Sequence, residues 1–179
     1  MHMAAKPKPW TIEEMYRLPD DGNKYEVVWG ELFVTPPPTD EHETIAARLT
    51  TILSPYAVAQ GLGLVYRPRA VMQFEGSEVE PDLMVRQQQA SPDATWEQAP
   101  TPILIVEILS ESTRRRDRNQ KRSFYLDAGV DEYWIVDPET RTITSIRRDR
   151  SDVVATDSLV WSPTGADESL EITLTNVFG

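Results

Sequence analysis

A run of seven residues, Ile103 to Leu109, constrains this chain more than any other segment, because only Glu107 within it is polar. A nearly continuous apolar run of this length, rich in Ile, Leu and Val, predicts a β-strand that is covered on both faces. Glu107 is therefore expected to lie inside the protein. A carboxylate there costs several kcal/mol unless another group pairs with it.

A second carboxylate, Asp82, stands directly before another apolar segment, Leu83 to Val85. Both acids need a partner, and two kinds of partner satisfy the need. A divalent metal held between Asp82 and Glu107 is one, and a well-placed Lys or Arg is the other. The pattern favours the metal.

The apolar run also begins a strand–helix–strand unit. A helix is expected from about Thr113 to Ala128, with Gly129 in the C-cap position, and a second buried strand from Asp131 to Asp137. Such a crossover joins two strands of one sheet. It places Glu107 near the end of its strand, where the active sites of such sheets gather.

The remaining segments complete a single α/β domain over residues 1–179, with a core from about 10 to 150 and C-terminal strands over 151–179. Capping-box spacing at Thr11 and at Asp40 predicts the starts of two helices. Strands are expected around Gly30 as a hairpin, and a loop over residues 87–102. Further strands are expected over residues 63–85, 142–147, 153–161 and 170–174.

Composition excludes several classes of protein. The chain has no cysteine, which rules out disulfides and thiolate metal sites. No apolar run reaches membrane-spanning length and no secretion leader is recognised, so we expect a cytoplasmic protein without a membrane partner. The net charge of −11 argues against a protein that coats nucleic acid non-specifically.

One basic segment stands out from this acidic background. Residues 114–122 contain six positive residues and one negative residue. The segment is either a solvated helix face or a phosphate-contacting patch, and the sequence does not separate the two. On the second interpretation, the residues expected to contact nucleic acid are Arg114, Arg115 and Arg118.

Helical spacing places Lys121 on the same face as Phe124, Tyr125 and Ala128. These three residues form the apolar stripe that must face the sheet, so Lys121 is expected to point inward, toward Glu107. The alternative is a plain Lys121–Asp117 pair on the helix. An inward ammonium group beside two carboxylates suits metal-assisted phosphodiester hydrolysis.

Mg²⁺ (or Mn²⁺) binds oxygen ligands and usually keeps several waters. Asp82 and Glu107, together with the backbone carbonyl of Ile108, would supply enough ligands from the protein. Asp82, Glu107 and Lys121 are the expected catalytic residues.

These residues resemble the PD-(D/E)xK superfamily of restriction endonuclease-like proteins. The similarity is greatest to a large bacterial branch of endonuclease-like proteins and domains of unknown function, and it covers about residues 10 to 150. The matching segments are Tyr25-Glu26, Gly30-Glu31-Leu32, Pro81-Asp82-Leu83, Ile105 to Ser110, the series Asp117, Lys121 and Tyr125, Gly129-Val130, and Glu132 to Pro138.

The resemblance implies a central mixed sheet flanked by helices, here with an added N-terminal helix and hairpin, a magnesium site at Asp82 and Glu107, and a homodimer. The superfamily lysine stands two residues after the acid, where this chain has Leu109. In this branch the lysine lies on the following helix, which fits Lys121.

Two further residues match the branch, and each has an ordinary structural alternative. Glu31 matches a glutamate near the site, which makes it a fourth expected catalytic residue, but it could instead be an exposed hairpin residue. His42 matches a histidine at the start of the second helix, but a lone His there is more often a hydrogen-bonded core residue. Trp29 stands where an aspartate is expected.

Two functions from different classes follow. The first is a Mg²⁺-dependent endonuclease that hydrolyses DNA, a hydrolase with DNA as its partner. The second is a catalytically inactive, dimeric binding or regulatory module that kept the nuclease fold. A third interpretation is a nuclease for single-stranded or structured substrates, with the basic segment 114–122 as its phosphate clamp.

Overall fold

Strand β7 (Leu104–Ile108) occupies an inner position in a six-stranded mixed sheet with the order β10-β9-β8-β7-β6-β3. The computed structural model describes residues 8–179. Within this sheet β7 and β8 are parallel and the other neighbours are antiparallel. The other strands are β3 (Leu64–Tyr66), β6 (Leu83–Arg86), β8 (Glu132–Asp137), β9 (Thr142–Ile146) and β10 (Val153–Ala155).

The expected crossover between β7 and β8 is confirmed. Its helix has three parts, α3 (Arg114–Arg116), the wider π-helical turn η2 (Asp117–Lys121) and α4 (Arg122–Asp127). The sequence predicted a regular helix here, so the π-turn is a difference. Gly129, with a φ of 83°, ends the helix as predicted.

A second, four-stranded sheet with the order β2-β1-β5-β4 lies beside the first. Its hairpin turn contains Trp29 and Gly30, both with positive φ, 48° and 80°. Two consecutive positive φ values are typical of the tight turns that join hairpin strands. The strands are β1 (Lys24–Val28), β2 (Glu31–Thr35), β4 (Met72–Phe74) and β5 (Ser77–Val79).

Both predicted helix starts can be compared with the structure. Helix α1 (Ile12–Met15) has the expected capping box between Thr11 and Glu14. Helix α2 (Asp40–Ala59) is capped by Thr39, whose Oγ1 accepts a hydrogen bond from the backbone N–H of His42 (3.3 Å). The cap is therefore one residue earlier than predicted. Asp40 instead joins the acidic first turn, where its charge favours the helix dipole.

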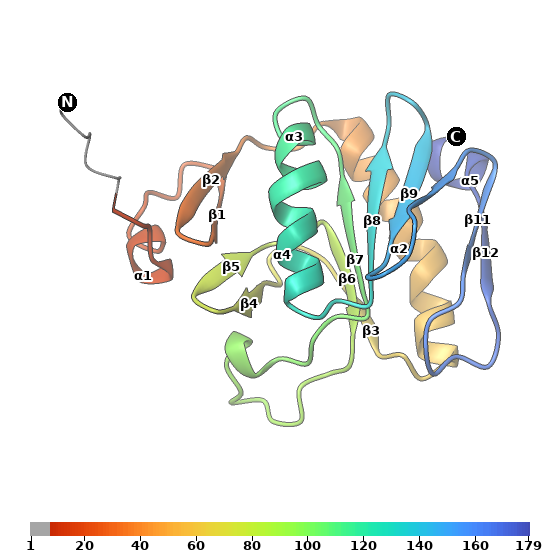
Figure 1. Ribbon diagram of the computed structural model, residues 1–179, viewed down its shortest axis with the longest axis horizontal. Coiled ribbons are helices and arrows are strands. Elements are labelled where there is room, and N and C mark those ends of the chain that lie inside the picture. Colours follow the sequence, from red (N-terminus) through yellow and green to blue (C-terminus); the bar gives the residue numbers. More distant parts are fainter. Residues whose placement is uncertain (1–7) are drawn as a thin grey trace.

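The helices cover opposite faces of the six-stranded sheet, α4 in front and α2 behind (Figure 1). The expected mixed α/β sheet flanked by helices is thus confirmed. On the α2 side, Trp161 packs against Trp134, with ring centroids 5.6 Å apart. The last elements belong to the same core and are β11 (Ser158–Trp161), β12 (Leu170–Thr173) and α5 (Thr175–Phe178).

The predicted loop over residues 87–102 contains one short 3-10 helix, η1 (Trp96–Gln98), and is otherwise irregular. Within residues 8–179, no helix is both long and apolar enough to cross a membrane.

Candidate active site

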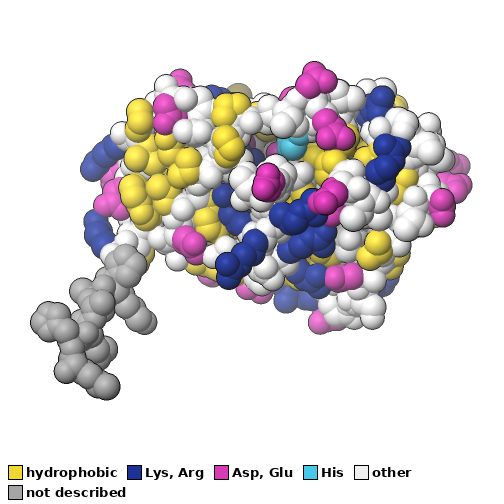
Figure 2. Space-filling view, turned by 90° about the horizontal axis from the view of Figure 1, so that it is seen from above, with side chains coloured by type: hydrophobic (Ala, Val, Ile, Leu, Met, Phe, Trp, Pro, Cys, Tyr) yellow, Lys and Arg dark blue, Asp and Glu magenta, His cyan; other side chains and the backbone are white. Residues whose placement is uncertain are grey.

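A cavity of about 1350 Å³ opens where β7 ends and the crossover helix begins. Figure 2 looks onto this end of the molecule, where Lys and Arg side chains (dark blue) and a histidine (cyan) gather near a hollow. Pro36, Pro37 and Pro38 form part of the cavity wall. Its polar lining includes Lys24, His42, Asp82, Glu107, Asp117 and Lys121.

Asp82 and Glu107 lie next to each other in this cavity, as the sequence predicted. Strand β6 runs antiparallel to β7 with Leu83 opposite Val106, which brings Asp82 beside the end of β7. The Oδ2 atom of Asp82 accepts a hydrogen bond from the backbone N–H of Ile108 (2.8 Å). Both carboxylates are buried.

Lys121 points inward and is 1% exposed. Its Nζ lies 2.7 Å from Oε1 of Glu107 and 2.8 Å from Oε1 of Glu26. Tyr125, one turn later, also donates to Oε1 of Glu107. The predicted inward orientation is confirmed, and the alternative of a simple pair with Asp117 is not the arrangement found. The lysine ends the π-turn η2, and such turns are frequent at functional sites.

Sequence reasoning missed two charged residues of this cluster, Glu26 and Lys24, both on β1. Glu26 is fully buried between its neighbours. Lys24 donates to the carbonyl of Glu80 (3.0 Å), and its Nζ lies 3.6 Å from Oδ1 of Asp82. The available signal was strand alternation, which puts Lys24 and Glu26 on one face of β1.

Of the two further candidates, His42 and Glu31, the structure places one in the cluster and the other outside it. His42 lies in the cluster, with Nε2 3.1 Å from Oδ2 of Asp82. Glu31 does not. It is exposed at the start of β2, where its carboxylate accepts a hydrogen bond from Gln120.

The two central acids have opposite pKa shifts. Burial raises the pKa of Glu107 to about 7, and the negative charge of Asp82 adds to the effect while Lys121 opposes it. Burial also opposes the charge of Asp82, but Lys24, His42 and the N–H of Ile108 outweigh it and lower its pKa. The site therefore holds one acid that stays ionised and one whose charge is costly without a further cation.

The pKa values of the three cationic partners are all raised. Burial opposes the charge of Lys121, yet Glu107 and Glu26 outweigh burial and raise its pKa. The pKa of Lys24 is likewise raised, because Glu26 and Asp82 outweigh its burial. Burial also works against protonation of His42, but Asp82 raises its pKa above the usual value.

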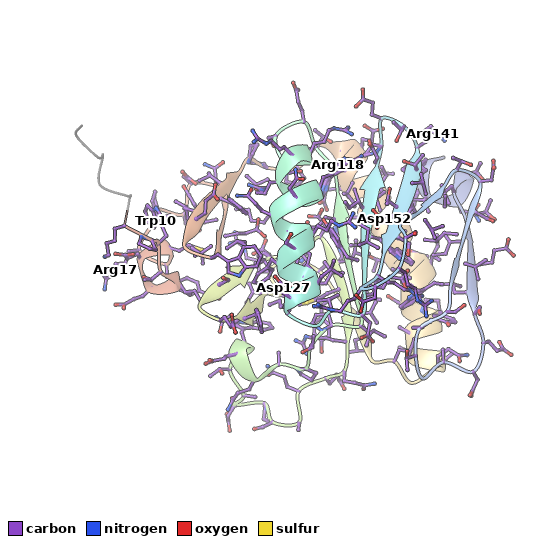
Figure 3. The ribbon with its side chains drawn as sticks, viewed as in Figure 1. Trp10, Arg17, Arg118, Asp127, Arg141 and Asp152 are labelled. Atoms are coloured by element: carbon purple, nitrogen blue, oxygen red, sulfur yellow. The ribbon has the colours of Figure 1, made fainter. Side chains whose placement is uncertain are left out.

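The basic segment 114–122 is largely paired with acids. Arg114 and Arg118 both donate to Asp137 at the end of β8. Arg122 forms two hydrogen bonds with Asp152. Figure 3 labels Arg118 on the upper part of the crossover helix and Asp152 beside β9. Of the three arginines expected to contact nucleic acid, Arg115 is exposed and has no ion-pair partner within residues 8–179.

A fully protein-built metal site is absent from the described residues, since no three His, Asp or Glu side chains are arranged to hold an ion. A site with two carboxylates and several waters fits better. Oδ1 of Asp82 and Oε2 of Glu107 accept no hydrogen bond from the part of the chain that the structure describes. Mg²⁺ commonly binds to one or two carboxylates and keeps several waters, so this donor set suits it.

Comparisons with known proteins identify the family and the fold of this chain. A family model described as Uma2, "Putative restriction endonuclease", matches residues 12–175. The crystal structure of "a putative nuclease belonging to DUF820 from Anabaena variabilis ATCC 29413" is similar, with a TM-score of 0.78, 22% sequence identity, and coverage of 95% of this chain and 98% of that chain. At this identity the likeness shows the fold.

The comparison with curated proteins gave no match. The family match covers most of the chain, including Glu26, Asp82, Glu107 and Lys121. Together with the restriction endonuclease-like fold, it establishes that this chain belongs to the Uma2 family of restriction endonuclease-like proteins.

Proposed function

We propose that this protein is a Mg²⁺-dependent endonuclease that hydrolyses phosphodiester bonds in DNA. The observation that carries the proposal is the convergence of Asp82, Glu107 and Lys121 in one large cavity. Membership of a nuclease family supports it. Buried charges are costly, and a fold used only for binding would gain stability by replacing them with apolar residues.

Asp82, Glu107 and the carbonyl of Ile108 would hold Mg²⁺ or Mn²⁺. When bound, the ion supplies a Lewis acid for the phosphate and lowers the pKa of a water. The chain itself orients the ligands. The N–H of Ile108 and the ring of His42 fix one oxygen of Asp82, and Lys121 fixes one oxygen of Glu107.

Lys121 and Lys24 have different roles in the proposed site. Lys121 is held between two carboxylates and is 1% exposed, so it acts by holding Glu107 and Glu26 in position. The side chain of Lys24 is 19% exposed and lines the cavity beside Asp82. Lys24 is therefore better placed to contact a phosphate and to neutralise its developing charge.

Nucleic-acid contacts are proposed for Arg114, Arg115 and Arg118. Arg115 is the strongest of the three, because the other two already share Asp137. We also propose a homodimer, on the family resemblance alone. Sedimentation equilibrium checks it, and a monomer at every concentration would contradict it.

Cleavage of supercoiled plasmid and of single-stranded DNA tests the proposal. We expect wild type to cut in Mg²⁺ or Mn²⁺ and not in EDTA, and Asp82→Asn and Glu107→Gln to lose at least 100-fold of the rate, on the order expected for loss of catalytic electrostatics. Arg150→Met, an exposed change, is the matched control.

Calorimetry with Mn²⁺ completes this experiment, because metal binding should vanish in the same two variants. A wild type that binds no metal and cuts neither substrate would instead support the inactive binding module. Cutting of single-stranded DNA alone would assign the substrate class of the third interpretation.

A further inference from the structure

A second, smaller cavity of about 130 Å³ lies at the opposite end of β6 from Asp82. Its walls combine apolar side chains with polar groups, and they come from β4, β6, the loop before β7 and the end of α4. The residues that matter here are Met72, Phe74, Met84, Arg86, Trp96 and Ala128. Arg86 lies four positions after Asp82 along extended chain, which corresponds to roughly 13 Å.

Arg86 is the unusual member of this lining. It is 2% exposed, and its guanidinium lies 3.9 Å from the centroid of the Tyr66 ring and 5.9 Å from that of Trp96. One Nη donates to the carbonyl of Gln87 (2.9 Å), while the buried Nε has no hydrogen-bond acceptor. Within residues 8–179 no carboxylate forms an ion pair with it, and nearby Glu97 is exposed.

The surroundings of Arg86 differ from those of the buried lysine in the active site. The buried lysine of the active site, Lys121, has two carboxylate partners. Arg86 has two aromatic rings and one carbonyl, which offset only part of the cost of burying a charge. A buried guanidinium with unused donors beside a cavity is suited to receive an anion from outside the chain.

We propose that this cavity binds a small carboxylate with a single apolar ring, and that Arg86 pairs with the carboxylate. The volume suits such a molecule, since an engineered apolar cavity of about 150 Å³ holds one benzene ring. Arg86 supplies the planar, two-donor geometry that a carboxylate accepts. Met72, Phe74 and Trp96 supply the apolar walls for the ring.

Trp96 forms one wall of the cavity. It lies on η1, in the irregular segment between β6 and β7, and one face of the Arg86 guanidinium is near its ring. A ligand here would order that segment without touching Asp82 or Glu107. The proposal therefore stands whether or not the protein cuts DNA.

Benzoate is the probe for the test, measured by calorimetry and by the thermal unfolding midpoint at constant ionic strength. Benzyl alcohol, which keeps the ring and lacks the charge, and acetate, which keeps the charge and lacks the ring, are the comparison ligands. We expect saturable benzoate binding, at least 10-fold tighter than either comparison ligand. Equal affinity for benzoate and benzyl alcohol would overturn the proposal.

Two variants locate the binding. Arg86→Met should abolish benzoate binding, and Ala128→Leu, which fills the cavity and keeps Arg86, should weaken it at least 10-fold. Arg150→Met is the control, because Arg150 is exposed. If Arg86→Met does not fold, Ala128→Leu decides the matter. Wild-type affinity in Ala128→Leu would place the ligand elsewhere and overturn the proposal.

Discussion

Lys121 is the residue on which the buried charges of the active site depend. Three carboxylates, those of Glu26, Asp82 and Glu107, lie close together, and Lys121 contacts two of them directly. Removing it leaves Glu26 and Glu107 side by side in a buried environment. Removal of one partner of a buried pair is far more costly than loss of a surface pair.

We therefore expect Lys121→Met to lower the free energy of unfolding by about 3–5 kcal/mol. Urea denaturation at pH 7 measures it. Glu26→Gln added to Lys121→Met should recover part of the loss, because it removes one of the two unpaired charges. A single variant Lys121→Met as stable as wild type would show that the cluster does not depend on this ion pair.

A comparison of Glu26 with Glu31 tests which glutamate belongs to the site. Glu31→Gln should change the free energy of unfolding by less than about 0.5 kcal/mol and leave cleavage unchanged, because Glu31 is an exposed residue. Glu26→Gln should lower the cleavage rate, because Glu26 positions Lys121. The reverse order of effects would restore Glu31 as the site residue.

Asp82, Glu107 and Lys121 were predictable because each stands in a strongly patterned segment, an apolar strand or an amphipathic helix. Glu26 was not, because its burial depends on Lys121 from a distant helix and on β5, which pairs with β1 across about fifty residues of sequence. Strand alternation places Lys24 and Glu26 on one face of β1, but the local sequence does not show that long-range pairings bury this face. A short hairpin strand with a Lys and a Glu looks like an exposed edge.

Among the secondary-structure elements, the crossover helix is held at its start by Asp137. This residue is 2% exposed at the end of β8 and pairs with Arg114 and Arg118. Burial opposes its charge, but the hydrogen bond and charge of Arg114 lower its pKa. Asp137 therefore anchors α3 and η2 to the sheet.

Asp137→Asn should destabilise the protein by about 1–2 kcal/mol at pH 7, between the values for surface and buried pairs. A lowered folded pKa means that the stabilisation is complete above the unfolded value, about 3.9, and is lost as the pH falls through the folded value. The difference from wild type should therefore shrink below about pH 4.

Urea denaturation at a series of pH values checks this expectation. Asp152→Asn, which removes a more exposed pair with Arg122, is the matched control and should cost less than about 1 kcal/mol. A difference that grows on acidification would assign the effect to another group.

For the crossover helix, the sequence predicts the extent and orientation but not the local irregularity. Its length, its inward face and its end at Gly129 follow from spacing and glycine chemistry. The π-turn over Asp117–Lys121 does not, because a single wide turn shifts the register without changing the composition. The N-cap of α2 is Thr39, one residue before the predicted Asp40. Both residue types are good caps, so the sequence alone does not decide between them.

For the whole molecule, the net charge of −11 and the pairing of most arginines in segment 114–122 leave little free positive surface there. DNA binding should therefore be weak and depend on a few contacts. Figure 2 shows Lys and Arg side chains gathered on the face that holds the cavity, with acidic residues among them. Binding should be strongest at low salt.

Replacing Arg114, Arg115 and Arg118 together with Ser should weaken DNA binding and reduce the slope of log affinity against log salt by about 1. Of these three arginines, Arg115 alone has no carboxylate partner within residues 8–179. Arg115→Ser alone should produce most of that change. Fluorescence anisotropy over a salt series measures the slope. An unchanged slope in the triple variant would assign the segment to structure alone.

The central claim is that Asp82 and Glu107 share a divalent ion. An anomalous difference map from crystals soaked in Mn²⁺ tests it most directly. We expect one strong peak in contact with a carboxylate oxygen of each residue and near the carbonyl of Ile108, absent from crystals of Glu107→Gln. No peak at this position in wild-type crystals, or a peak that survives in Glu107→Gln, would contradict the account.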